Sequence, residues 1–444
     1  MANIKPFRGL RYNRERVDPA MAISQPYDRV RYGLQDKYYA LNPYNIVRII
    51  RGKELPSDIP DQAEGPNVYT RARSYLELWQ AEDVLIREEK PAVYVYHQSF
   101  MIDGVPYTRK GFIAAFELCP FGEGIVLPHE RTHAGPKVDR LHLTQSIAAN
   151  VGQIFMLYPD PQNQVSGLLD VAIAGKAPDL EAHEMYEQDV RQQMWVVTDP
   201  ATIESVQAEM SSKRNLIIAD GHHRYETAIN YRDKMRARYP DAPPNAAFNY
   251  RMVTMVSMDD PGLVILPTHR EIFDYPQITP TEAASRVREA FDVIPVADLD
   301  ACLSTMQEHV EAHAFGMYGD GRYHVLVLKS PALIEQYIPG PRSMDWKSLD
   351  VSIAHKILLE QLLRLPAEAA ETQSNVRYHR DPKLGIENVN AGRGNFCVLL
   401  NPTRIGQVKS CAGQGEKMPQ KSTDFYPKMV SGLTLMPIPA EELI

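Results

Sequence analysis

Residues 216–228 read LIIADGHHRYETA, in which four apolar residues precede a carboxylate, a glycine, two histidines and an arginine. The apolar residues predict a short buried strand, and the run that opens at Tyr225 predicts an amphipathic helix. A turn from strand to helix directs backbone N–H groups and the positive end of the helix dipole at one place. We therefore expect this turn to bind a phosphate, with Arg224 as a planar cationic fork and Asp220 as an oxygen ligand for Mg²⁺.

Each residue of this turn, taken alone, also fits an ordinary structural role. Asp before a helix is a common N-cap, and Gly is common in turns. Two adjacent histidines between Asp-Gly and Arg, directly after a buried strand, are much harder to explain by capping. The group as a whole therefore favours a functional site.

Length and composition limit the classes of protein that fit. The chain has 444 residues, more than one hydrophobic core normally serves, and its net charge of −8 argues against nucleic acid as the main partner. No stretch reaches the roughly 18 to 20 apolar residues that span a bilayer, and the first six residues lack the apolar core of a signal peptide. We expect a cytoplasmic protein without a membrane partner. Homo-oligomers are common at this size, so a homo-oligomer is one partner to consider, but the sequence does not decide the oligomeric state.

Strands and helices alternate irregularly along the chain, which predicts an α+β fold rather than a doubly wound sheet. We divide the chain into an N-terminal α+β segment (1–118), a catalytic core (119–274) and a C-terminal α+β segment (275–444). A hairpin is expected around Asp103-Gly104. Helices are predicted near 67–80, 201–211, 281–290, 299–312 and 349–363, and further strands near 154–158, 194–197, 252–258, 314–318, 324–329 and 395–400. The four cysteines are scattered and are expected to be free buried thiols.

A second chemically dense segment, residues 127–140, reads LPHERTHAGPKVDR. Its HERTH portion matches the H-E-x-x-H pattern of zinc proteases, which requires one continuous helix to place both histidines on one face. Pro128 before the pattern and Gly135-Pro136 after it leave room for about two helical turns, so we disfavour zinc. The alternative is a loop that presents Glu130 as a general base amid cations, as phosphoryl transfer to a hydroxyl requires. The surrounding basic side chains are His129, Arg131, His133, Lys137 and Arg140. An ordinary solvated charged loop is the remaining interpretation.

The combination of Pro-His-Glu and Asp-Gly-His-His-Arg resembles the free-serine kinases of archaea, members of the ParB/sulfiredoxin-like superfamily. That resemblance implies a ParB-like core with a mixed sheet and phosphorylation of free L-serine to O-phosphoserine, within serine metabolism. It implies that Glu130 is the catalytic base and that residues 220–224 hold phosphate and Mg²⁺. The separation between Glu130 and Asp220 is much longer here than in the archaeal enzymes, so an inserted segment would have to loop out for the two to meet.

Over nearly its whole length the chain also resembles a bacterial family known as domain of unknown function 1015. The matching segments are 4–9, 26–28, 42–48, 127–130, 136–140, 220–224, 266–270 and 421–423. Relatives that use inorganic pyrophosphate as phosphoryl donor imply the same donor here. The residues agree in part, because basic side chains are abundant while no Walker-type or kinase-type nucleotide motif is present. ATP and ADP remain alternative donors.

The predicted site is therefore as follows. The catalytic residues are Glu130, Asp220 and His223, and Asp220 is the predicted Mg²⁺ ligand. Substrate and phosphate are assigned to His129, His133, Lys137, Arg140, Gly221, His222, Arg224, His269, Arg270, Lys421, Ser422 and Thr423. Two other functions remain open: hydrolysis of a phosphate ester or of pyrophosphate at the same site, and a ParB-like nucleotide-switched DNA-binding module. The acidic balance and the lack of a helix-turn-helix with basic flanks count against the last.

Overall fold

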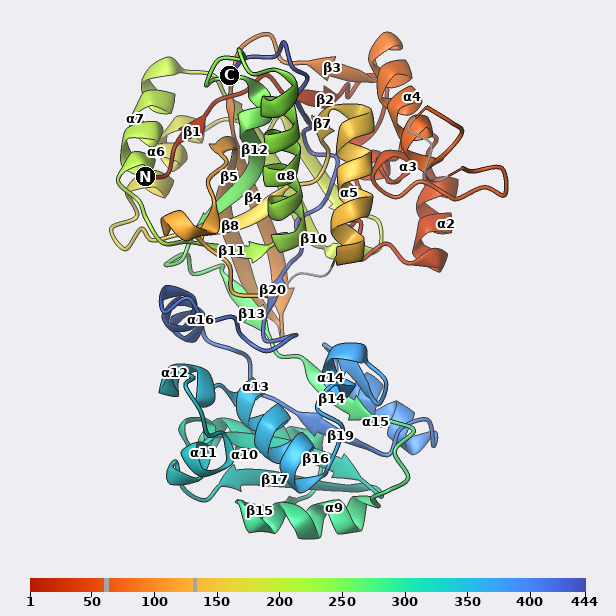
Figure 1. The fold of residues 1–444 in the computed structure, drawn as a ribbon, viewed down its shortest axis with the longest axis vertical. Helices are drawn as coiled ribbons and strands as arrows, with labels where there is room; N and C mark the ends of the chain where they lie inside the picture. Colours follow the sequence, from red (N-terminus) through yellow and green to blue (C-terminus); the bar gives the residue numbers. More distant parts are fainter. Residues whose placement is uncertain (60–63, 131–133) are drawn as a thin grey trace. The chain divides into compact units, whose positions relative to one another are not determined.

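The computed structural model describes residues 1–59, 64–130 and 134–444. These residues form two compact units, each with its own sheet (Figure 1). The first unit comprises Met1–Pro128, Thr132–Val264 and Pro427–Ile444, and the second comprises His129–Arg131 and Ile265–Tyr426. The structure confirms the predicted α+β class. The predicted three-part division of the chain stays a prediction.

The first unit is built on a nine-stranded mixed sheet whose main path runs β6-β11-β8-β12-β5-β4-β10-β9, with β1 beside β5. Neighbours pair antiparallel except β6 with β11 and β8 with β12, which are parallel. The strands are β1 (Ile4–Lys5), β4 (Val93–Ile102), β5 (Val105–Glu117), β6 (Val126–Leu127), β8 (Ile154–Tyr158), β9 (Leu180–Glu184), β10 (Glu187–Val197), β11 (Leu216–Asp220) and β12 (Tyr250–Ser257). Two small sheets accompany it, β2 (Leu10–Tyr12) with β3 (Leu85–Arg87) and β7 (Ala149–Asn150) with β21 (Met436–Pro437).

The hairpin of β4 and β5 forms where the sequence predicts it. Asp103 and Gly104 both have positive φ, 49° and 79°, as the tight hairpin turn favoured by Asp-Gly requires. Val93 pairs at the far end with Val197 on β10, so the hairpin continues into the sheet. The ends of the two strands away from the turn are buried, at residues 93–98 of β4 and 111–116 of β5.

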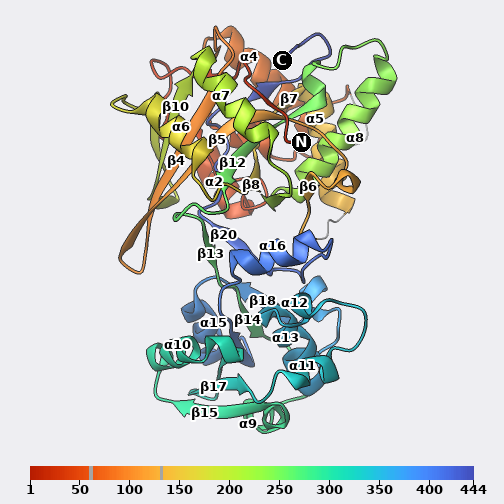
Figure 2. The same ribbon diagram turned by 90° about the vertical axis from the view of Figure 1, so that its left-hand side faces the viewer.

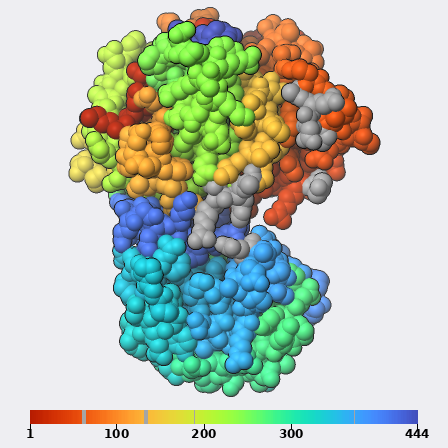
Figure 3. Space-filling view, viewed as in Figure 1, coloured from red at the N-terminus to blue at the C-terminus, as the bar shows by residue number. Residues whose placement is uncertain are grey.

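Helices of the first unit pack in two groups. Helices α6 and α7 contact each other, α6 also contacts β10 and α7 contacts β1, whereas α5 and α8 form a separate adjacent pair (Figure 2). In the space-filling view the gold surface of α5 and the green surface of α8 are neighbours on one face (Figure 3). The helices are α1 (Pro19–Ala22), α2 (Tyr32–Leu41), α3 (Val47–Ile50), α4 (Val68–Ala81), α5 (Ala134–Ile147), α6 (Gln164–Ile173), α7 (Pro200–Ser211) and α8 (His222–Arg238).

Local sequence explains where two of these helices begin. The Asn67 side chain accepts hydrogen bonds from the first turn of α4, and the Thr70 hydroxyl accepts a hydrogen bond from the Asn67 N–H, which completes a capping box. Asp199 caps α7 in a similar way, and Pro200 occupies its first turn, where no backbone N–H is required. Both helices confirm the predicted ranges to within one residue.

The second unit contains a six-stranded antiparallel sheet in the order β15-β17-β16-β19-β14-β18. Its strands are β14 (His269–Ile272), β15 (Phe291–Val296), β16 (Ala314–Gly319), β17 (Arg322–Leu328), β18 (Val376–His379) and β19 (Phe396–Leu399), and β13 (Val264–Leu266) pairs separately with β20 (Asp424–Tyr426). Its helices are α9 (Pro280–Arg286), α10 (Leu299–Glu308), α11 (Ala332–Tyr337), α12 (Met344–Lys347), α13 (Asp350–Ile353), α14 (Ala369–Thr372), α15 (Pro382–Asn390) and α16 (Ile405–Gly413). The predicted helix 349–363 is α13 continued by a π-helical stretch, η5 (Ala354–Leu362).

The four cysteines are free and buried, as predicted. Among the residues described, no helix is both long enough and apolar enough to cross a membrane.

A buried carboxylate on β14 holds part of the second unit together. Glu271 is fully buried and accepts hydrogen bonds from Arg377 Nη1 at 2.6 Å, His379 Nε2 at 2.6 Å and Asn388 Nδ2 at 2.8 Å. Glu271→Gln removes the charge at nearly constant shape. We expect it to lower the free energy of unfolding by roughly 2–3 kcal/mol in a urea titration, because charge-assisted bonds to donors on β18 and α15 are lost.

The control is Glu311→Gln, which removes an exposed ion pair with Arg404 and should change stability little. Equal unfolding free energies for the two variants would show that the Glu271 cluster does not stabilise this unit.

Candidate active site

The turn between β11 and α8 begins and ends as its sequence dictates. β11 ends at Asp220, and Gly221 has φ +98°, a left-handed conformation that glycine adopts without a steric penalty. The helix begins at His222, three residues before the predicted start at Tyr225. His222, His223 and Arg224 therefore form the first turn of a 17-residue helix, where N–H groups and the helix dipole favour an anion.

Asp220 and Arg224 form a buried ion pair inside this turn. Arg224 Nη2 donates to Asp220 Oδ2 at 2.5 Å, and Nη1 donates to the carbonyl oxygen of Gln153. Burial alone would raise the pKa of the Asp220 carboxyl, but nearby positive charges, led by Lys428 and then Arg224, outweigh it and lower the pKa below its usual value. Asp220 is therefore a carboxylate at neutral pH.

Gly221 allows the Arg224 side chain to fold back over the turn. A Cβ atom added at Gly221 would lie 3.1 Å from Arg224 Nε, in addition to the strain of the positive φ. We expect Gly221→Ala to lower the free energy of unfolding by about 1–2 kcal/mol and to reduce kcat/KM, since both strain and crowding act on the Asp220–Arg224 pair.

The matched control is Gly167→Ala in α6, where an added Cβ meets nothing within 4 Å and φ is ordinary. Thermal unfolding and kinetics on both variants test the prediction. An activity loss shared by the two would contradict it.

Lys137 and Arg140 lie on a helix, which corrects the expectation that residues 127–140 form one loop. α5 begins at Ala134, so Gly135 and Pro136 fall in its first turn, where proline is tolerated. Lys137 Nζ pairs with Glu226 Oε2 of α8 at 2.8 Å. The pairing of α5 with α8 thus brings the cations predicted at 137 and 140 beside the Asp220 turn.

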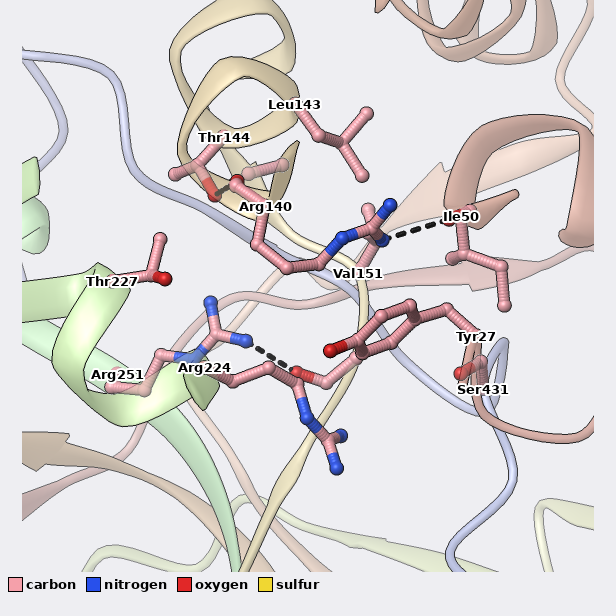
Figure 4. Close-up of a pocket in the computed structure, with 12 residues that line it drawn as sticks. Tyr27, Ile50, Arg140, Leu143, Thr144, Val151, Arg224, Thr227, Arg251 and Ser431 are labelled. Carbon is pink, nitrogen blue, oxygen red and sulfur yellow. Dashed lines mark hydrogen bonds between the residues drawn. The ribbon is translucent and has the colours of Figure 1, made fainter. Parts of the chain in front are cut away.

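Beside this turn is a small pocket, partly open to solvent and lined by three arginines (Figure 4). Arg140, Arg224 and Arg251 are only 8%, 7% and 6% exposed. The Arg140 guanidinium lies 4.1 Å from the centre of the Tyr27 ring. The other lining residues are Ile50, Leu143, Thr144, Ala149, Val151, Gly152, Thr227 and Ser431.

Sequence reasoning missed two of the polar residues that line this pocket. Tyr27 belongs to the family-matching segment 26–28, for which no role in the site was predicted from sequence. Arg251 is the one charged residue of the buried strand β12, and that isolated charge was the available signal. A charged residue inside an apolar strand is rarely buried without a partner or a ligand.

The second unit gathers the Pro-His-Glu segment and the Lys-Ser-Thr segment. His129 is completely buried, and its Nε2 lies 2.9 Å from Thr423 Oγ1. The His129 carbonyl accepts from the Met418 N–H at 2.8 Å. Glu130 follows with its side chain 34% exposed and its Oε1 4.0 Å from His129 Nε2, so its carboxylate is accessible to solvent within this unit.

Two other predicted residues of this unit, Arg270 and Ser422, form hydrogen bonds within it. Arg270 is 1% exposed and donates to the Lys421 carbonyl at 3.2 Å and to the Thr268 carbonyl. It thereby supports the turn at Lys421, whose φ is +59°. Ser422 Oγ donates to the Pro419 carbonyl at 2.5 Å.

His269 is buried as well, and its Nδ1 accepts from the Leu400 N–H at 3.2 Å. Burial, and next the charge of Arg270, lower the pKa of His269 to about 4, so it is neutral at pH 7 and does not supply a cation. The assignment of His269 to substrate and phosphate binding stays a prediction.

The H-E-x-x-H pattern is only partly within the described residues. His129 and Glu130 precede α5 and are not helical, and His133 lies outside the described residues. Among the residues that the structure does describe, no group of three or more His, Cys, Asp or Glu side chains could hold a metal ion. The non-helical backbone at 129–130 agrees with setting the zinc-protease interpretation aside.

Several solved structures are similar over 72% of this chain. A conserved hypothetical protein from Pyrococcus furiosus is 12% identical, with 94% of that chain covered and a TM-score of 0.31. A free serine kinase in complex with AMP is 12% identical, with 90% covered and a TM-score of 0.33. SbnI from Staphylococcus aureus, with a C-terminal truncation, is 8% identical, with 87% covered and a TM-score of 0.33.

A search of curated proteins found no significant match. The model of one protein family matches residues 4–352, which is well over half of the chain, and this range includes the Pro-His-Glu segment and the Asp220 turn. The chain belongs to the family described as Protein of unknown function (DUF1015).

Proposed function

We propose that this protein is a phosphotransferase that moves a phosphoryl group to the hydroxyl of free L-serine, giving O-phosphoserine. The observation that carries the proposal is the Asp220–Arg224 ion pair in the first turn of α8. An ionised carboxylate, a guanidinium and a helix N-terminus at one point are suited to a bound phosphate and its metal. The Pro-His-Glu and Asp-Gly-His-His-Arg motifs support serine as acceptor through their resemblance to free-serine kinases and to a ParB/sulfiredoxin-like core.

The proposed step uses Glu130 as the general base. Its carboxylate takes the proton from the serine hydroxyl while the serine oxygen bonds to phosphorus, and the bond from phosphorus to the leaving phosphate breaks. The motif resemblance assigns this role to Glu130, and its solvent-accessible carboxylate within the second unit is compatible with it. His222, His223 and Arg224 would bind phosphate oxygens, with Lys137, Arg140 and the Lys421–Thr423 segment as further substrate-binding residues.

Magnesium fits the residues at this turn. Asp220 is a carboxylate whose Oδ2 is bonded to Arg224, which leaves its other oxygen as a hard ligand. A single carboxylate together with substrate phosphates and water is a common magnesium environment. When bound, the ion would neutralise charge on the donor phosphates.

Inorganic pyrophosphate is the donor that we propose. A donor made only of phosphate requires cations and no surface for stacking a base. At the Asp220 turn, Arg224 and the N-terminus of α8 offer N–H donors and positive charge to phosphate oxygens, and the sequence carries no nucleotide-binding motif. The family resemblance favours the same donor.

The test is to incubate the protein with Mg²⁺ and L-serine and, separately, with pyrophosphate, ADP or ATP, and to follow products by phosphorus-31 NMR. We expect phosphoserine and inorganic phosphate from pyrophosphate, at a rate well above that with either nucleotide. Phosphoserine formed with ATP or ADP but not with pyrophosphate would support the kinase function and identify a nucleotide as the donor. Failure to form phosphoserine with any donor would refute the proposed function.

A further inference from the structure

Arg251 is a buried cation with an unusual shortage of partners. It lies on β12 and is 6% exposed, and its Nη2 donates to the Gly152 carbonyl at 2.6 Å. Its Nε is buried and has no hydrogen-bond partner. Among the described residues, Arg251 forms no ion pair with a carboxylate. A buried guanidinium in this condition is destabilising unless something else supplies negative charge.

The other two arginines of the pocket differ in this respect. Arg140 donates to Asp139 Oδ2 through Nε at 2.8 Å and through Nη2 at 2.6 Å. Arg224 is paired with Asp220. Carboxylates of the protein therefore balance the charges of Arg140 and Arg224, whereas no carboxylate among the described residues pairs with Arg251.

The pKa of Arg251 also indicates that its charge lacks a balancing partner. Burial first, and then the charges of Arg224 and Arg140, lower the pKa of Arg251 to about 9. The group remains protonated at neutral pH, so the pocket carries a positive charge that no protein carboxylate among the described residues balances, in a poorly solvated place. Binding an anion there would remove this repulsion.

The pocket wall indicates which kind of anion fits. Ile50, Leu143 and Val151 provide aliphatic surface, and Thr144 and Thr227 provide hydroxyls. Tyr27 enters from the side opposite Arg251 (Figure 4). One uncompensated charge beside an aliphatic wall suits a single carboxylate group on a small organic molecule, whereas a polyphosphate requires several unpaired cations.

We propose that Arg251 binds the carboxylate of the amino-acid acceptor, so that this pocket is the acceptor's site and determines its specificity. This inference rests on the proposed function, because it takes serine as the acceptor. It assigns pyrophosphate to the Asp220 turn and the amino acid to the adjoining pocket, both within the first unit. Acceptors without a carboxylate, such as ethanolamine and serinol, should be poor substrates.

Binding tests the pocket without relying on catalysis. Titration calorimetry of L-serine, with and without methylenediphosphonate as a pyrophosphate analogue, should show binding to the wild type. Arg251→Met should weaken it by about 10²-fold, the loss of one charge-assisted bidentate contact. Serinol should not bind either protein. Arg191→Met, the same change at an exposed residue of β10, is the control and should bind serine normally.

Stability separates a binding role from a structural one. Replacing a buried, unpaired charge by an apolar side chain of similar length should leave the melting temperature of the Arg251→Met protein unchanged or higher. Serine should then raise the melting temperature of the wild type and not that of the variant. A marked fall in melting temperature would show that Arg251 supports the fold, and would overturn the inference.

Kinetics distinguish the failure of this inference from the failure of the proposed function. In an active enzyme, Arg251→Met should raise KM for serine by about 10²-fold and leave KM for pyrophosphate nearly unchanged. A rise in KM for pyrophosphate alone would show that the donor binds in this pocket. That result would overturn the inference and leave the proposed kinase function intact. If phosphoserine never forms but serine binding still depends on Arg251, the serine-binding role of the pocket is supported and the proposed kinase function is refuted. Absence of serine binding to the wild type overturns the inference outright.

Discussion

Replacing Glu130 by Gln should lower kcat for phosphoserine formation by about 10²-fold or more, with little change in the binding of serine or pyrophosphate. The substitution keeps the size of the side chain and removes its ability to accept the hydroxyl proton. His129, fully buried and bonded to Thr423, should hold the segment in place in the variant. Initial rates by phosphorus-31 NMR and affinities by calorimetry measure the two effects separately.

The control for this variant is Glu123→Gln, an exposed glutamate in the short helix η1 (Phe121–Glu123). It should turn over at the wild-type rate. Full activity of the Glu130→Gln protein would remove Glu130 as the base. A loss of substrate affinity with unchanged turnover would instead make it a binding residue.

Replacing Arg224 by Ala should raise KM for the phosphoryl donor by roughly 10-fold to 10²-fold, because a bidentate contact to phosphate is lost. The same change leaves the buried Asp220 carboxylate without its ion-pair partner and the Gln153 carbonyl without its donor. We therefore also expect a fall of roughly 3 kcal/mol or more in the free energy of unfolding. KM for each substrate and a urea titration are the measurements.

Arg232→Ala separates the two consequences. Arg232 lies on the same helix, is buried, and donates to the Leu118 carbonyl at 2.7 Å, but it does not line the pocket. Its removal should lower stability without raising donor KM. If the two variants showed the same donor KM, Arg224 would have only a structural role.

Much of the local structure near the Asp220 turn was predictable from sequence. The apolar run before Asp220 is β11, and the hairpin at Asp103-Gly104 and the helix after Asn67 form as predicted. These features depend on local periodicity, turn chemistry and caps, which are visible in a short window. The early start of α8 at His222 was missed because Asp-Gly-His-His has no apolar periodicity, although Gly221 permits a helix to begin there.

The error over α5 has a similar physical origin. Gly135 and Pro136 were taken as helix breakers, but a proline in the first turn replaces an N–H that would have no intrahelical acceptor. The segment therefore presents Lys137 and Arg140 from a helix beside α8 rather than from a loop.

Tertiary information was required for the pocket itself. Arg251 comes from β12, Tyr27 from near the N-terminus and Arg224 from α8, and no sequence spacing links them. The neutral state of His269 and the internal hydrogen bonds of Arg270 likewise follow from burial, which a short motif does not reveal. The motif is the source of the chemistry proposed for the Asp220 turn, whereas the pocket beside it is visible only in the fold.

The destination of the transferred phosphoryl group tests the central claim most directly. The wild-type protein, Mg²⁺, pyrophosphate and L-serine are incubated in ¹⁸O-enriched water, and products are followed by phosphorus-31 NMR. Transfer to serine predicts phosphoserine and inorganic phosphate in equal amounts, neither carrying ¹⁸O, because the new bond to phosphorus comes from the serine oxygen. Inorganic phosphate carrying ¹⁸O, with no phosphoserine, would mean that water is the acceptor and would contradict the account.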